Sequence, residues 1–284
     1  MIKITALMDN KPSENKALIH EHGLSLLVER DDFRALFDCG AGEAVWYNAH
    51  RLGKDISNID AVVLSHSHYD HAAGYRDLIE QGDGSSVLYT GARFFEPKYA
   101  FDGVRYTDLS AGFDREFLAE YNIMHRECTA MTEIARGIYL IGGFPRIHEF
   151  ERIADRFVKL LPEQSVYGVD TALVQDDFSD EICMAIETQK GILILVGCSH
   201  PGILNMVEWV HAQLKQPVFG VLGGTHLIEA DCERIEKTVD RLKEMGLKLL
   251  GMSHCSGEQS EEIIQRDQDV MSCHLSVGDT IFFD

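Results

Sequence analysis

An α/β fold is predicted for this chain by a strand–loop–helix pattern that repeats through its C-terminal half. Apolar runs at residues 191–196, 218–222 and 247–252 have the length of buried strands. The first two precede segments whose apolar residues recur every three or four positions, as on one helix face: Ile203, Val207, Val210 and Leu214, then Ile235, Val239, Leu242 and Met245. This order of elements is typical of α/β proteins.

The N-terminal half is predicted to begin with strands. Residues 2–8 form one apolar strand, residues 24–29 and 34–38 form a hairpin around 30–33, and a helix follows over about 43–53. Residues 61–64 are a buried strand that stops at a histidine-rich loop. Residues 92–135 show no clear period, residues 138–141 are another strand, and residues 144–170 alternate between helical character, over 149–161, and loop. We interpret 92–170 as an insertion or lid that contributes to a pocket wall.

The composition favours one globular domain over residues 1–284 that acts on a small molecule. Only 6 prolines occur, and no stretch rich in Ser, Gly and Pro separates two halves. With 26 basic and 46 acidic residues, the net charge of −20 repels phosphates and argues against a nucleic-acid partner. No apolar run is long enough to span a membrane, and the seven cysteines include no CxxC pair. A cytoplasmic protein is therefore expected.

Four predicted strands end in loops that carry histidine. These loops read LSHSHYDHAAG, GCSHPG, GGTHL and SHCSG. Because ligands of α/β proteins bind outside the carboxyl ends of strands, the loops should meet at one end of the fold. They would gather imidazoles and one carboxylate, a set that suits zinc, iron or manganese: His66, His68, Asp70, His71, His200, His226 and His254.

The spacing inside the first loop has a physical reason. His66 and His68 are separated by one residue, so in an extended segment their side chains point the same way and can bind one ion. Asp70 and His71 follow where the chain turns into a helix, and they can face a second ion. The pattern HxHxDH therefore predicts a metal site.

This motif resembles that of the metallo-β-lactamase superfamily. Further segments resemble its dihydropteroate-synthase-like branch, whose members are often labelled as a synthase of the pterin pathway: EHGLSLLVE, LFDCG, GFPR, GCSHPGILN, LGGTHL and HCSG. The resemblance covers almost the whole chain. It implies a four-layer αββα sandwich with the metal site at one edge of the sheets.

The resemblance also assigns ligands. It implies that His66 and His68 bind a first metal, and that Asp70, His71 and His254 bind a second. It places Asp38 behind the site, where its carboxylate would orient a ligand histidine.

The chain departs from the superfamily pattern after residues 191–196. Cys198 stands where a bridging aspartate is usual, and His200 follows two residues later. We expect His200 to be a ligand, whereas Cys198 is either a thiolate ligand or a buried bystander. One or two divalent transition-metal ions are expected, with zinc first and iron or manganese as alternatives.

The predicted function is that of a metal-dependent hydrolase that activates water, with a small phosphoester or a related metabolite as substrate. Asp70 would bind metal and orient the nucleophile, and His226 would donate a proton to the leaving group, although His226 could also bind metal or stabilise its turn. Arg146 could bind a phosphate or form a surface ion pair.

Three alternative functions remain from the sequence. One is a ribofuranosylaminobenzene-phosphate synthase of the pterin (methanopterin-type) pathway. The second is a redox di-iron protein, and the third is a non-catalytic sensor of a metal or metabolite. Cys255 is expected to be inert packing. The remaining histidines are expected to be structural or solvated: His20, His22, His50, His125, His148, His211 and His274.

Overall fold

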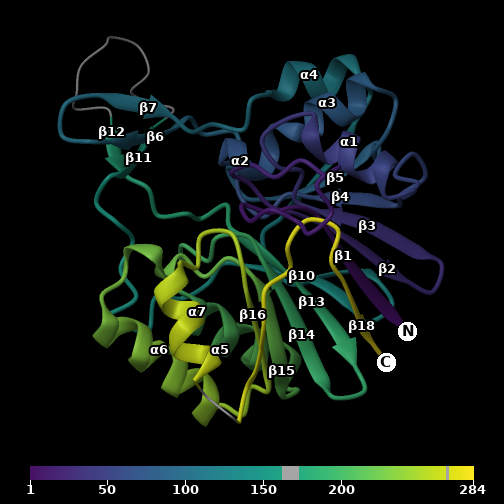
Figure 1. The fold of residues 1–284 in the computed structure, drawn as a ribbon. Coiled ribbons are helices and arrows are strands. Elements are labelled where there is room, and N and C mark those ends of the chain that lie inside the picture. The colour runs from purple at the N-terminus through teal and green to yellow at the C-terminus, as the bar shows by residue number, and fades with distance from the viewer. Residues whose placement is uncertain (162–172, 267–268) are drawn as a thin grey trace.

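The fold stacks two large sheets face to face and covers each outer side with helices (Figure 1). The structure is a computed structural model that describes residues 1–161, 173–266 and 269–284. In the described residues this is the four-layer αββα arrangement, and it confirms the predicted fold class. The two termini lie close together at the same side of the molecule (Figure 1).

The first large sheet is built mainly from the N-terminal part of the chain. Its seven strands, counted over the described residues, lie in the order β18 (Thr280–Phe283), β1 (Ile2–Met8), β2 (Ser25–Arg30), β3 (Phe33–Phe37), β4 (Ala61–Val63), β5 (Val87–Gly91) and β8 (Met124–Cys128). The expected hairpin is confirmed, because Arg30 pairs with Phe33 across a two-residue turn. The strands β3, β4 and β5 are parallel, so their carboxyl ends share one edge.

The second large sheet holds the predicted C-terminal strands. The described part of the chain gives it seven strands in the order β17 (Met271–Cys273), β16 (Leu249–Met252), β15 (Val218–Gly223), β14 (Gly191–Val196), β13 (Ile182–Thr188), β10 (Ile138–Gly142) and β9 (Thr132–Ala135). Neighbouring strands from β14 to β17 are parallel. The loops that follow β14, β15 and β16 therefore leave the sheet at the same edge.

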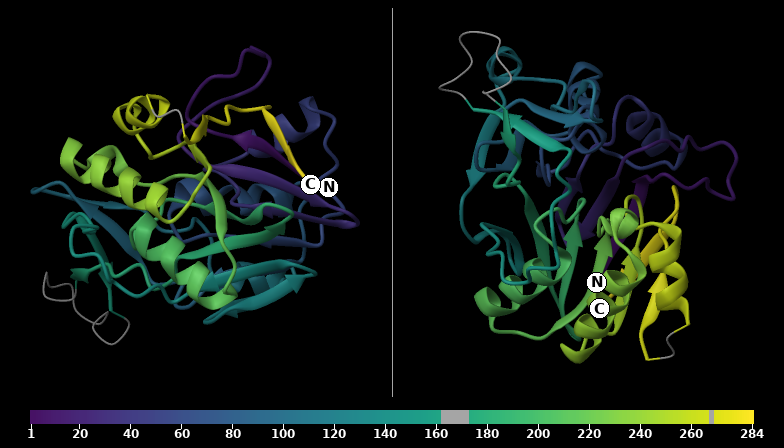
Figure 2. Two further views of the ribbon diagram at one scale, coloured as in Figure 1. Left: turned by 90° about the horizontal axis from the view of Figure 1, so that it is seen from below. Right: turned by 90° about the vertical axis from the view of Figure 1, so that its left-hand side faces the viewer.

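Helices cover the outer faces of both sheets (Figure 2). Over the first sheet lie α1 (Ala44–Arg51), α2 (Tyr69–Ala72), α3 (Gly74–Glu80) and α4 (Arg115–Glu120); over the second lie α5 (Ile203–Leu214), η3 (Leu227–Glu229), α6 (Cys232–Glu244) and α7 (Glu258–Gln265). The helices predicted after residues 191–196 and 218–222 are confirmed as α5 and α6. No helix in the described ranges is long and apolar enough to cross a bilayer.

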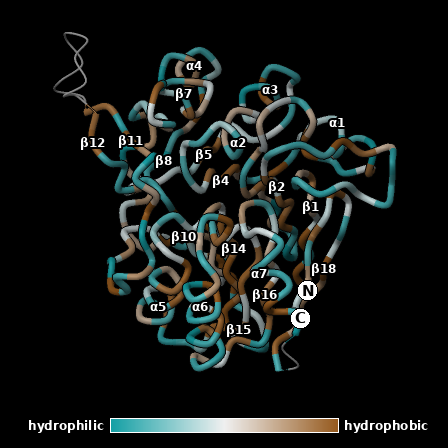
Figure 3. The backbone as a smooth tube through the Cα atoms, turned by 60° about the vertical axis from the view of Figure 1, so that its left-hand side comes forward, coloured by the Kyte–Doolittle hydropathy of each residue, from teal (hydrophilic) through white to brown (hydrophobic). Residues whose placement is uncertain are grey.

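Strand β14 shows why the sheets pack in this way. Leu193 and Leu195 point into the core between the two sheets, whereas Ile192, Ile194 and Val196 point into the core beneath α5 and α6. Side chains alternate across a strand, so an uninterrupted apolar strand needs an apolar partner on each face. Figure 3 shows hydrophobic residues concentrated along the inner strands, whereas the outer helices carry both hydrophobic and hydrophilic residues.

A smaller sheet stands beside the sandwich, near the edge where the histidine-bearing loops lie (Figure 1). It consists of β12 (Leu173–Gln175), β11 (Phe157–Leu160), β6 (Lys98–Phe101) and β7 (Tyr106–Asp108). Residues 92–170 thus divide between this sheet and the large ones, since β8, β9 and β10 belong to the sandwich. The part of the expected lid at 162–170 lies outside the described residues.

The helical character expected over residues 149–161 is wrong. Phe157–Leu160 is strand β11, which pairs antiparallel with β6 through partners such as Phe157 and Ala100. Glu151, earlier in the segment, accepts hydrogen bonds from the backbone N–H groups of Leu204 and Asn205, both at 2.9 Å, at the start of α5. Contacts distant in sequence therefore determine this segment's conformation.

Candidate metal centre

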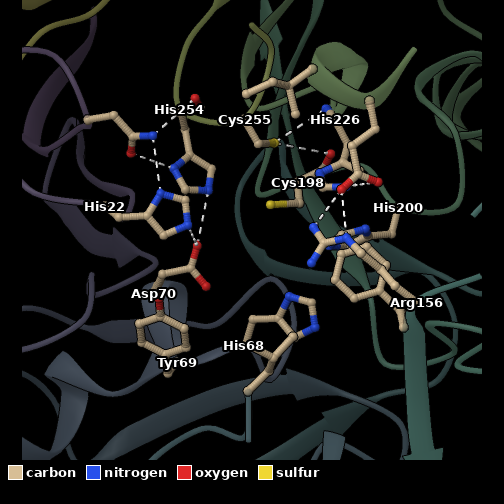
Figure 4. A pocket seen from close by; sticks show the side chains of 15 residues that line it. His22, His68, Tyr69, Asp70, Arg156, Cys198, His200, His226, His254 and Cys255 are labelled. Carbon is tan, nitrogen blue, oxygen red and sulfur yellow. Dashed lines mark hydrogen bonds and ion pairs between the residues drawn. The ribbon is translucent and has the colours of Figure 1, made fainter. Parts of the chain in front are cut away.

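Four loops at the shared edge of the sheets bring most of the predicted site residues together. They follow β4, β14, β15 and β16 and surround a cavity of about 420 Å³ (Figure 4). Predicted residues that line it are His68, Asp70, Cys198, His200, His226 and His254. His66 and His71 lie just beneath, fully buried.

Three of these histidines form a donor set that we name position A: His66, His68 and His200. One ligand nitrogen from each lies within 4.8 Å of the others. Among the described residues, Nε2 of His66, Nε2 of His68 and both ring nitrogens of His200 have no hydrogen-bond partner. Burial lowers the pKa of all three imidazoles well below the usual value, so they are neutral and present lone pairs. Such buried, unpaired nitrogens fit a metal ion.

Asp38 determines how His66 is turned. The Ser65 hydroxyl donates to Asp38 Oδ2 at 2.8 Å and accepts from His66 Nδ1 at 3.0 Å. The proton on His66 is therefore assigned to Nδ1, which leaves Nε2 free to bind metal. Ser65 was not singled out in the sequence, although it immediately precedes the HxHxDH motif.

A second donor set, position B, consists of Asp70, His71 and His254. The two Nε2 atoms lie 3.1 Å apart, and Asp70 Oδ2 lies 3.2 Å from the Nε2 of His254 and 3.6 Å from that of His71. His71 Nδ1 contacts Asp38 Oδ2 at 2.7 Å, and His254 Nδ1 contacts Asn10 Oδ1 at 2.9 Å. Both Nε2 atoms thus face one carboxylate oxygen.

This geometry fits a divalent metal. Ligands about 2.1 Å from one ion in a tetrahedral arrangement lie roughly 3.4 Å apart, close to the separations at position B. Burial opposes ionisation of Asp70, but His71, His22 and His254 together hold its pKa well below the usual value. The carboxylate is therefore charged and able to bind a cation.

His22 was expected to be structural or solvated, yet it reaches this site. Its Nε2 lies 3.1 Å from Asp70 Oδ2 at the mouth of the cavity. His22, Asp70 and His254 form another group of donors within 4.8 Å of one another. The chain is held there because the Leu24 N–H donates to the Asp70 carbonyl at 3.2 Å. No local pattern around His22 would have indicated this contact.

His226 lies at the rim of position A. Its ring centroid is 4.3 Å from that of His200, and its Nε2 lies 3.5 Å from Glu229 Oε2. Burial lowers the pKa of His226, but Cys255 and Glu229 more than compensate and raise it to about 9. His226 therefore holds a proton at neutral pH, in contrast to the three neutral imidazoles of position A.

The loops that carry the donors have unusual backbone conformations. Of the non-glycine residues with positive φ in the described chain, four lie at this site: Asp38, Ser199, His226 and His254. Such conformations cost free energy and persist where surrounding contacts impose them, which is common at functional sites. At Gly224, a Cβ atom would lie 2.4 Å from the Gly197 carbonyl oxygen, so only glycine permits this approach of two loops.

Two adjacent carboxylates before β13, missed in the sequence, hold the loops of position A. Asp180 Oδ2 accepts the N–H of Ser67 at 2.9 Å, between the two histidines of the motif. Glu181 Oε2 accepts the N–H of His200 at 2.9 Å. Lys98 Nζ, from the smaller sheet, lies 2.5 Å from Asp180 Oδ1. An acidic pair directly before a buried strand was the available sequence signal.

Arg146 does not line the cavity. It donates to the Asp177 carbonyl at 2.6 Å and faces a separate hollow. Arg156 lines the cavity instead, with Nε 2.7 Å from Glu229 Oε1 and its guanidinium carbon 4.1 Å from the centre of the Phe157 ring.

Comparisons with known proteins indicate the family of this chain. The family model described as the metallo-beta-lactamase superfamily matches residues 20–143. A 7,8-dihydropterin-6-methyl-4-(beta-D-ribofuranosyl)-aminobenzene-5′-phosphate synthase of Methanocaldococcus jannaschii is 31% identical, over 94% of this chain and 91% of that protein. An uncharacterised protein of the same organism is 33% identical over 90% of this chain and 91% of its own length.

Solved structures show the same likeness. A crystal structure described as a metal-dependent hydrolase of the beta-lactamase superfamily superposes with a TM-score of 0.83, at 26% identity and with both chains fully covered. Its fold and the sequence relatives lead to one conclusion. The chain belongs to the metallo-β-lactamase superfamily, in the branch that includes the pterin-pathway synthase.

Proposed function

We propose that the protein is a metal-dependent hydrolase that activates water to cleave a small phosphoester. The observation that carries this proposal is the convergence of two donor sets on one cavity, one of them with buried nitrogens that lack any partner among the described residues. Zinc suits a site of imidazoles and a carboxylate, with iron and manganese as the alternatives. The ligands would be those of positions A and B.

A bound divalent metal lowers the pKa of water and stabilises negative charge on oxygen. The chain's own residues supply the other requirements. The Asp70 carboxylate would bind the metal and orient the nucleophile through Oδ2, which faces position B. His226 holds a proton on a ring that borders position A, so it can donate to a leaving group.

The walls of the cavity support a small substrate with an anionic group. Arg156 is the one lysine or arginine that lines the cavity in the described ranges, and its ion pair with Glu229 fixes its guanidinium. Phe157, Leu109 and Ile228 provide apolar surface nearby. A volume of about 420 Å³ suits a metabolite rather than a polymer.

A second candidate function is that of the pterin-pathway synthase. The observation in its favour is the relative of that name, which matches over nearly the full length of both chains. This reaction would require the cavity to accept a dihydropterin together with an aromatic amine that carries a phosphorylated ribose. Arg156 and the Phe157 ring are the groups available to contact them.

The test measures turnover and metal content in the same preparations. Protein loaded with zinc, iron or manganese is assayed with bis(p-nitrophenyl) phosphate, with and without a chelator. We expect turnover that the chelator abolishes and that metal restores. A metal-loaded protein that hydrolyses no phosphoester would contradict the hydrolase and favour a sensor. Formation of 7,8-dihydropterin-6-methyl-4-(β-D-ribofuranosyl)aminobenzene 5′-phosphate from 6-hydroxymethyl-7,8-dihydropterin diphosphate and 4-(β-D-ribofuranosyl)aminobenzene 5′-phosphate, with release of diphosphate, would establish the synthase instead.

A further inference from the structure

The sulfur of Cys198 occupies a central place that the assignments above leave unused. Among the described residues it joins three separate groups of donors, each within 4.8 Å: one with His66 and His71, one with His200 and His226, and one with His254 and Cys255. Its sulfur therefore lies between positions A and B. Figure 4 shows it between the His254 side chain and the side chains of His200 and His226.

The contacts of Cys198 are not those of a packed apolar thiol. Its Sγ lies 3.2 Å from His71 Nε2. The Nδ1 of His71 faces the Asp38 carboxylate at 2.7 Å, so Nε2 presents its lone pair towards the sulfur. Either the thiol donates its hydrogen to that lone pair, or thiolate and imidazole bind the same cation.

The surrounding histidines favour the cation. His200 is 4% exposed and neither of its ring nitrogens has a partner among the described atoms; the buried Nε2 of His66 is likewise unpaired. A thiol hydrogen could satisfy His71 alone, and it would leave these nitrogens without a partner. One metal ion on each side of the sulfur would satisfy both sets.

Cys255, the neighbouring cysteine, has a different environment. Its Sγ accepts the backbone N–H of His226 at 3.3 Å and lies 3.7 Å from the carbonyl oxygen of Cys198. Of the donor groups in the described part of the chain, Cys255 joins only the one that also contains His254. It contacts backbone groups of the loops and the side chains of His226 and Cys198, and as a metal donor it reaches one position, whereas Cys198 reaches both.

We propose that Cys198 binds as a thiolate that bridges the metal ions at positions A and B. The proposal rests on the metal-dependent function proposed above and adds a ligand to its site. On binding, the thiol proton is released to solvent and the sulfur lone pairs bind the two ions. A sulfur ligand makes the centre softer than one built from imidazole and carboxylate alone, which favours zinc over manganese.

X-ray absorption of the zinc-loaded protein tests the assignment directly. A sulfur shell is expected at about 2.3 Å, separate from nitrogen and oxygen at about 2.0–2.1 Å. The cobalt-loaded protein should also show a near-ultraviolet sulfur-to-cobalt charge-transfer band. Cys198→Ala should lose the shell and the band, and should bind about one fewer ion per chain. Cys198→Asp should keep the metal through oxygen and still lose both sulfur signals.

Two cysteine variants are the matched controls. Cys255→Ser, at the same site, and Cys232→Ser, on the exposed surface, should both retain the sulfur shell. Full metal content without a sulfur shell in the wild type would overturn the bridging thiolate and leave the proposed function standing. Loss of the shell in Cys255→Ser but not in Cys198→Ala would also overturn it. A wild-type chain that binds no divalent metal would overturn both proposals.

Discussion

Positions A and B share the segment after β4 and draw their remaining donor from different loops, and they are held in different ways. At position A, Ser65 contacts the ring of His66, and the other supporting contacts go to the backbone: Asp180 accepts the Ser67 N–H, and Glu181 accepts the His200 N–H. Nε2 of His66, Nε2 of His68 and both ring nitrogens of His200 remain without partners in the described structure. At position B the supports contact the donor side chains themselves.

The difference has a chemical consequence. A metal at position A displaces no existing hydrogen bond of the unpaired nitrogens, and it relieves the cost of their burial. A metal at position B must replace the contacts that Asp70 makes with His22 and His254. We therefore expect position A to fill first.

The largest expected effect is the loss of position A. His66→Ala with His68→Ala removes two of its three donors, so the metal content should fall by about one ion per chain. Metal analysis beside phosphodiester turnover measures the change. His50→Ala with His211→Ala, on exposed helix positions, is the matched control. Retention of full metal content in the His66/His68 variant would show that position A holds no ion.

The second prediction tests whether His226 is a ligand of position A or a proton donor beside it. Because its ring carries a proton and borders the set without completing it, His226→Ala should keep most of the metal. Its turnover should fall by about two to four orders of magnitude, as for loss of a proton donor. His200→Ala and His254→Ala are the comparison variants, and both should lose metal. If His226→Ala alone empties a position, the loop after β15 supplies the ligand and His200 does not.

Asp38 connects the two positions, so its replacement should affect both. Its carboxylate contacts His71 directly and His66 through Ser65. Asp38→Asn should weaken metal binding about 10–100-fold, as measured by competition with a chromophoric chelator.

Glu181→Gln is the contrasting variant, because Glu181 supports only the His200 loop. It should weaken position A and leave position B near the wild-type affinity. If Glu181→Gln lowered the metal affinity of positions A and B equally, as Asp38→Asn is expected to do, the two positions would not be held independently.

The histidine loops were predictable because their signal is local. A short apolar strand that ends in a histidine identifies the loops of His66, His200, His226 and His254 without knowledge of their neighbours. Parallel pairing of the strands then brings the loops to one edge.

The residues that support or line the site from other parts of the chain had no comparable sequence pattern. Lys98 belongs to a smaller sheet formed by segments far apart in the chain, and His22 reaches Asp70 only through the packing of the loop before β2. The sequence analysis singled out Arg146 and did not consider Arg156, which the structure places at the cavity. Partners distant in sequence determine these placements, which periodicity cannot show.

The smallest expected effect concerns the outer support of position B, by which we mean Asp9, His274 and Glu261 behind the His254 loop. Asp9 Oδ1 accepts the His254 N–H at 3.0 Å, and its Oδ2 lies 2.7 Å from His274 Nε2. Glu261 lies 3.2 Å from the other ring nitrogen. Burial lowers the pKa of His274, but Asp9 and Glu261 outweigh it and raise the pKa to about 9. The protonated ring therefore ties the His254 loop to the C-terminal segment.

The pH dependence follows from the sign of this shift. The folded pKa lies above the unfolded value of about 6.5, so the stabilisation is complete below about pH 6.5 and is lost as the pH rises through about 9. His274→Gln should lower the free energy of unfolding by about 1–2 kcal/mol near pH 6, allowing for solvent screening of a partly exposed pair. The difference from wild type should vanish near about pH 10. Urea unfolding across this range measures it, with His211→Gln as the exposed control. A difference that stays constant with pH would mean that His274 stabilises the loop by packing, and that no charge contributes to the outer support of position B.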